Sequence, residues 1–254
     1  MLFDLRGKRK RLVQVSYAAL AVIFLVGFIG FSIGSGNAPG GILDAIGLGG
    51  NGSGGDSLSS QFDDQIDAAN QQLAKDPKDT RALLKLAEAE YQKAKSGVSQ
   101  DPDTGQISVS SDAHTDLGNS ADAWARYLRV NKGKPDPDAA ALMVQVYYLL
   151  NDAAGAAKAQ RIVTEETPNV GNYNQLAFYE YASYDIAAGD AAAEKAEQMT
   201  PKSQRKQVHD QLQTIREQAV KLKKQQAKAQ EKAPSPTTPG ANPLQNPLGV
   251  QPQP

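Results

Sequence analysis

Three prolines divide the central part of the chain into two segments of almost equal length. Pro137, Pro168 and Pro201 lie 31 and 33 residues apart. Each interval holds two stretches in which apolar residues recur at helical spacing. A fixed period of this size is typical of arrays of stacked helical hairpins, in which neighbouring units bury one continuous core. The feature predicts an all-α fold and a surface that binds something.

An uncharged run near the start predicts a membrane-spanning helix. Residues 12–33 are 22 residues without a charged side chain, and a helix of that length spans about 33 Å, enough for the ~30 Å apolar core of a bilayer. Residues 1–11 carry five basic side chains and one acidic one, which favours a cytoplasmic N-terminus. We therefore expect a single-pass protein whose later domains lie outside the cytoplasm. The alternative is a cleaved signal peptide, but its apolar part is normally about 7–15 residues long.

The composition on either side of the periodic region predicts flexible segments. Residues 34–57 are rich in Gly and Ser and predict a flexible linker. Residues 233–254 include seven prolines, and such a segment cannot bury enough apolar surface to fold, so we expect a disordered tail. The helical repeat domain is expected at 58–201.

The repeat domain contains one interruption. Residues 97–119 lack helical periodicity and predict a loop insertion, within which residues 106–110 alternate apolar and polar side chains as a short hairpin does. The helical pattern resumes at Ser120. Its spacing predicts an inward face made of Ala121, Trp124, Ala125 and Leu128.

A long basic helix is expected at residues 202–232, which hold nine basic and three acidic side chains. Its apolar residues are spaced 4-3-4-3 and form a narrow seam, made of Val208, Leu212, Ile215, Ala219 and Leu222. Such a helix either caps the last repeat or pairs with a partner helix, which includes a homodimer. Its basic surface is also compatible with anionic lipid headgroups. No nucleic-acid partner is expected.

The periodic region, from Ser59 to Pro201, resembles the tetratricopeptide repeat. That family has small residues where the two helices of a hairpin cross and a proline after the second helix. Counting back from Pro201 places Ala177, Gly189 and Ala196 at the small positions. The interval before Pro168 departs once, with Val144 at the small position of its first helix. The stretch after Pro77 begins a third unit, which the insertion splits; its apolar residues are Leu83, Leu86 and Ala87.

The resemblance implies a binding groove on the first helix of each repeat. In the family these helices line a concave face, and its equivalents here include charged, polar and aromatic side chains. They are Arg81, Leu84, Glu88, Tyr91, Gln145, Tyr148, Asn174, Phe178 and Tyr181. Aromatic side chains would anchor an extended or helical peptide. The alternative is that Tyr148, Phe178 and Tyr181 pack against neighbouring repeats.

The order of segments is similar to that of bacterial membrane-anchored repeat proteins of the cell envelope. That resemblance implies a scaffold in the bacterial plasma membrane that binds a protein or peptide outside the cytoplasm. A chaperone-like accessory factor near the secretion channel is the alternative. A purely structural dimer paired through residues 202–232 is a third class.

Catalytic chemistry is not expected from this sequence. The chain has no cysteine and two histidines, His114 and His209, so thiolate nucleophiles and Cys-based zinc sites are excluded. The segment from Asp101 to Asp112 departs from a calcium-binding loop, because its Gly is misplaced and its final residue is not Glu. We expect neither an enzyme, nor a cofactor, nor a metal site.

Overall fold

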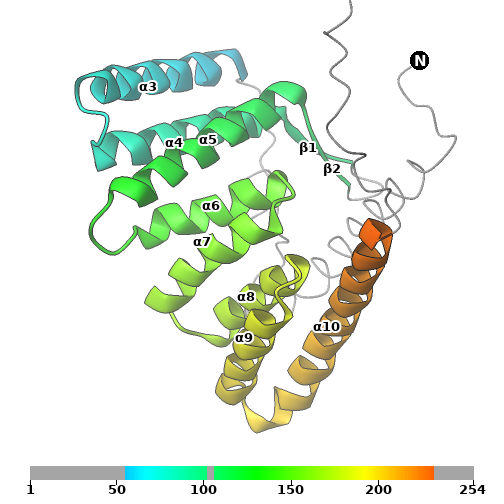
Figure 1. The fold of residues 1–254 in the computed structure, drawn as a ribbon. Coiled ribbons are helices and arrows are strands. Elements are labelled where there is room, and N and C mark those ends of the chain that lie inside the picture. Colours follow the sequence, from blue (N-terminus) through cyan, green and yellow to red (C-terminus); the bar gives the residue numbers. More distant parts are fainter. Residues whose placement is uncertain (1–54, 102–105, 232–254) are drawn as a thin grey trace, which may run out of the picture.

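The computed structural model describes residues 55–101 and 106–231, which form eight α-helices and one two-stranded hairpin (Figure 1). The predicted all-α class is confirmed for these residues. Calls on residues 1–54 (the basic N-terminus, the span at 12–33 and nearly all of the linker) and on the tail from residue 232 onward lie outside them. The elements are α3 (Gly55–Lys75), α4 (Thr80–Ala94), a 3-10 turn (Lys95–Gly97), β1 (Val98–Gln100), β2 (Ile107–Val109), α5 (Ser111–Val130), α6 (Pro137–Leu149), α7 (Ala153–Glu166), α8 (Val170–Ala182), α9 (Ile186–Met199) and α10 (Lys202–Glu231).

Two consecutive hairpins have the same frame, repeated after 33 residues. Helix α8 begins and ends 33 residues after α6, and α9 does so after α7. The capping residues repeat as well, because Asp136, Asp152, Asn169 and Asp185 each accept backbone N–H bonds at the first turn of a helix. Proline therefore marks the units, and Asx caps begin every helix in them.

The hairpins stack in chain order, and α10 packs along the last of them (Figure 1). The buried side chains form two clusters. The first cluster extends from α3 to α8 and includes Leu83, Trp124 and Met143. The second cluster joins α8, α9 and α10 and includes Tyr181 and Leu212. Only α8 contributes buried residues to both, so it is the joint between them.

The predicted insertion is shorter than expected. Residues 98–109 contain an antiparallel hairpin in which Val98 pairs with Val109, but α5 already begins at Ser111, so the expectation of a loop up to residue 119 was wrong. Ser110 caps the helix by accepting from the Ala113 amide. The fully buried Ser120 hydroxyl donates to the Ala87 carbonyl of α4 at 2.6 Å. These contacts hold a polar segment as helix.

The inward face of α5 also differs from the expected one. Trp124 is buried, as predicted, but Ala125 and Leu128 are exposed. Their places are taken by Ala123 and Tyr127, because the face continues the line of residues buried in the first two turns of α5. At the other end of the chain's described part, α3 begins at Gly55 and so includes the last three residues of the expected linker.

Glycine at position 189 is required by close packing. A Cβ atom there would lie 2.4 Å from Cδ1 of Tyr181, whose ring is 1% exposed and has no room to move. We expect Gly189→Ala to lower the unfolding free energy by about 1–3 kcal/mol, since overpacking outweighs the gain of up to about 1 kcal/mol in helix propensity. Gly118→Ala in α5 is the matched control, because its Cβ would have no heavy atom within 4 Å. Urea titrations of both variants measure the difference, and equal stabilisation by both would contradict it.

Carboxylates around Lys93 predict a pH effect on stability. The Nζ atom of Lys93 lies 2.9 Å from Asp63 and 3.8 Å from Asp116, and Glu90 is buried beside them. Burial raises the pKa of the Glu90 carboxyl, an effect to which Asp116 adds. The folded state therefore binds a proton more readily than the unfolded chain, and stability is lost as the pH rises above the unfolded value. Glu90→Gln should raise the melting temperature at pH 7, and the gain should vanish below about pH 4. A gain that persists there would contradict this cause.

Candidate binding face

The expected groove residues do not form one continuous surface. Arg81 and Glu88 are exposed on α4, and both line a cleft between α3 and α4 together with Gln65 and Gln72 of α3. Leu84 is half-buried against the first cluster. The N-terminal part of the expected face is therefore a charged cleft of its own.

Tyr91 and Gln145 are brought into direct contact. The Tyr91 hydroxyl of α4 donates to Gln145 Oε1 of α6. The Tyr91 ring is 3% exposed, and burial raises its pKa to about 12. Tyr91 is thus a buried strut that orients Gln145, which is half-buried. Its predicted exposure to a ligand was wrong.

Tyr148 and Phe178 are the aromatic residues that remain accessible on this face. Both are half-buried and pack against the first cluster, and Phe178 also touches the second. Together with Tyr147 and Tyr179 they line a small hollow between the α6–α7 turn and α8. Burial raises the pKa of the Tyr148 hydroxyl, which keeps it neutral at physiological pH. These two rings can anchor an apolar side chain.

Tyr181 is a core residue, so its assignment to the groove is corrected. Its ring lies over Gly189, and its hydroxyl donates to Asp190 Oδ1 at 2.8 Å. The guanidinium of Arg216 in α10 grips the same carboxylate, with Nε 2.6 Å from Oδ1 and Nη2 3.1 Å from Oδ2. This pairing holds the pKa of Asp190 below its usual value. Position alone predicted a groove residue, but α9 and α10 cover it.

Asn174 lies on the accessible side of α8 and carries an unsatisfied atom. The residue is half-buried, and its Oδ1 is shielded from solvent without a hydrogen-bond partner in the described part of the chain. The Oε1 atom of Gln218 in α10 has the same property. Buried amide oxygens normally have a donor. Both atoms are therefore suited to accept an N–H from a bound chain.

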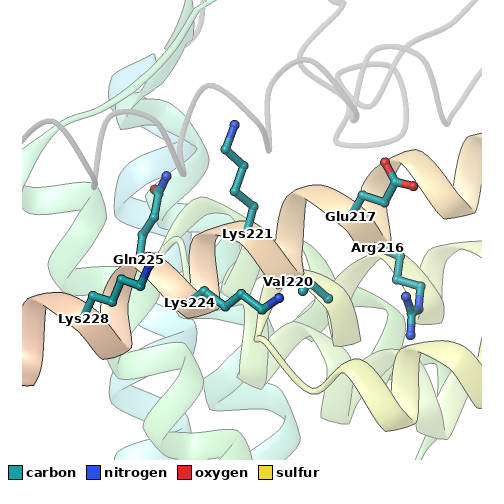
Figure 2. Close-up of a pocket in the computed structure, with 7 residues that line it drawn as sticks. All are labelled: Arg216, Glu217, Val220, Lys221, Lys224, Gln225 and Lys228. Carbon is teal, nitrogen blue, oxygen red and sulfur yellow. The ribbon is translucent and has the colours of Figure 1, made fainter.

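Helix α10 carries its apolar seam against α8 and α9. Val208, Leu212, Ile215 and Ala219 are buried in the second cluster, which is the arrangement expected of a capping helix. Leu222, the last seam residue, is half-buried. Figure 2 shows side chains of the second half of α10, where Lys221, Lys224 and Lys228 are exposed and lie opposite the seam.

Sequence reasoning missed the contribution of α10 to this side of the molecule. Gln211 and Gln218 are half-buried, and a helical wheel of residues 202–228 would have placed them together. The described residues contain no group of three His, Asp or Glu side chains that could hold a metal ion. None of the described helices is long and apolar enough to cross a membrane.

No protein-family model matches the chain, and no curated protein is similar to it in sequence. The functional argument therefore rests on the geometry of the domain. That geometry offers two accessible rings, Tyr148 and Phe178, beside the amides of Gln145 and Asn174.

Proposed function

We propose that the protein is a membrane-anchored scaffold that binds a protein or peptide outside the cytoplasm. Its binding domain is a short solenoid of tetratricopeptide type, and residues 12–33 tether it to a bacterial plasma membrane. The observation that carries the proposal is the 33-residue frame shared by α6–α7 and α8–α9. Such a frame places equivalent positions of successive first helices on one surface.

The small residues expected of the repeat support the resemblance. Ala177 and Ala196 are completely buried, and Gly189 is buried under Tyr181. Ala156 is also completely buried in the preceding unit. Small side chains at these crossings allow the two helices of each hairpin to approach closely, which leaves larger residues for the outer surfaces.

The binding mode follows from the accessible rings. Tyr148 and Phe178 belong to adjacent units, and their neighbours on the same side, Gln145 and Asn174, offer amide donors and acceptors. A peptide can place apolar side chains against the rings and hydrogen-bond its backbone to the amides. Discrete anchors of this kind favour a specific partner.

Photocrosslinking in cells tests the binding face. A photoreactive residue at Tyr148 or Phe178 should crosslink one dominant envelope protein, identified by mass spectrometry. Ala191, exposed on α9, is the control position and should give much less of that product. Many secreted chains in place of one would favour the chaperone-like alternative. No product from either ring would remove the docking claim.

Proteolysis of spheroplasts tests the placement outside the cytoplasm. A protease added to intact spheroplasts should cut within residues 34–232, while residues 1–11 remain protected until the membrane is permeabilised. Cutting only after permeabilisation would overturn the proposed topology, whatever the crosslinking shows.

A further inference from the structure

Helix α10 has one flank without charge. At about 100° per residue, a single line along the helix collects polar side chains that are all neutral. They are Gln204, Gln207, Gln211, Thr214, Gln218 and Gln225. The basic residues of α10 occupy the outer surface and the other flank.

The neutral flank lies on the side of α8. The opposite flank faces α9, because His209 Nδ1 lies 2.8 Å from Glu197 and Arg216 pairs with Asp190. Lys223 on that flank donates to the Tyr184 carbonyl at the α8–α9 turn. Since the seam between the two flanks is buried against both helices, the glutamines border the accessible side of α8.

Helices α6 and α8 continue this uncharged surface. Their accessible side chains are aromatic rings and amides, two of whose neighbours hold oxygen atoms without a donor. We name the surface the neutral face and define it as Gln145, Tyr148, Asn174, Phe178, Gln211 and Gln218. A face with apolar anchors, amides and no charge fits an uncharged, extended chain better than a charged one, which would lose its hydration without gaining an ion pair.

The chain itself contains a segment with these properties. Residues 233–254 have no charged side chain and include seven prolines. The triplet Asn-Pro-Leu occurs twice, at 242–244 and 246–248. Proline-rich segments dock on aromatic-lined surfaces at low entropic cost, because they are already extended. Their carbonyl groups accept hydrogen bonds from Gln and Asn amides.

The segment is long enough to reach the face. The helical distance from Glu231 back to Gln211 is about 30 Å at 1.5 Å per residue. The 22 residues from 233 to 254 span about 68 Å in a polyproline conformation. The segment can therefore reverse direction after α10 and bring both Asn-Pro-Leu triplets to the level of Phe178.

We propose that residues 233–254 dock on the neutral face of their own chain, with the rings of Tyr148 and Phe178 as anchors. This inference rests on the proposed function, since it assigns to the same binding face a competitor within the molecule. An external partner must displace the segment, so the face is accessible only to ligands that bind more tightly than the tethered segment does.

Intramolecular crosslinking in the full chain tests the proposal. A photoreactive residue at Gln218, on the neutral flank, should crosslink residues 240–250 of the same molecule. The matched position is Lys221, three residues nearer to the segment but on the exposed outer surface, and it should give a yield several-fold lower. Leu244→Ser with Leu248→Ser should lower the Gln218 yield several-fold. Circular dichroism confirms that each variant is folded.

Equal or higher yields from Lys221 would overturn the proposal, because simple proximity would then explain the product. A product of doubled mass would place the segment on a second copy and would also overturn it. If Phe178 captures an envelope protein but Gln218 never captures the segment, this inference is lost and the proposed function stands. If neither product forms, both are lost.

Discussion

Leu212→Asp is expected to detach α10 from the domain while α4 to α7 stay folded. Leu212 is 4% exposed in the second cluster, so the change removes a packed side chain, worth about 2–5 kcal/mol, and buries a carboxylate without a partner. The first cluster depends on none of the residues of α10. Because a stacked array is stabilised by contacts between neighbours, the loss should stay local.

Hydrogen exchange measures this outcome element by element. The amides of α9 and α10 should lose protection in Leu212→Asp, whereas those of α4 and α5 should keep it. Thr214→Asp, at an exposed position of the same helix, is the control and should change little. A uniform loss of protection in all helices would show that the two clusters unfold as one unit, contrary to this expectation.

Trp124→Ala is expected to lower the unfolding free energy by about 3–5 kcal/mol, as large truncations in a core do. Trp124 is 2% exposed and stacks on Tyr127, with ring centroids 5.1 Å apart. The Tyr127 hydroxyl accepts from the Asp136 amide at 3.0 Å, so the same contact positions the cap of α6. Losing the indole should therefore weaken both α5 and the junction to the next hairpin.

Leu128→Ala is the matched control on the same helix. Leu128 is 38% exposed, and its truncation should change the unfolding free energy by less than about 0.5 kcal/mol. Chemical denaturation followed by tryptophan-independent circular dichroism compares the two variants. Similar losses from both would mean that the inward face of α5 was assigned incorrectly.

The sequence predicted helices well where several local signals coincide. In residues 137–199, a proline or an Asx cap precedes each helix, and apolar spacing runs through it. The start of α5 was not predictable in this way. Residues 111–119 are polar and contain Gly118, yet Leu117 is completely buried and Ser120 bonds to α4. Contacts between helices overrode the local preference there.

The candidate site was predicted less well than the helices, for a related reason. Repeat spacing correctly placed Tyr148, Phe178 and Asn174 on the accessible side of their helices. It says nothing about which later helix covers a position, so Tyr91 and Tyr181 were assigned to a surface although both are buried. The neutral flank of α10 depends on the same docking, which the spacing of the first repeats does not contain.

The shared frame of α6–α7 and α8–α9 has a consequence for how such a chain can change over evolutionary time. Because the caps at Asp136 and Asn169 are equivalent, duplicating residues 137–169 would insert a further hairpin with its own start signals and its own small residues. The joint at α8 and the cap α10 would move outward without new design. Length, and with it the size of the ligand, is then a quantity that gene duplication can adjust in steps of one unit.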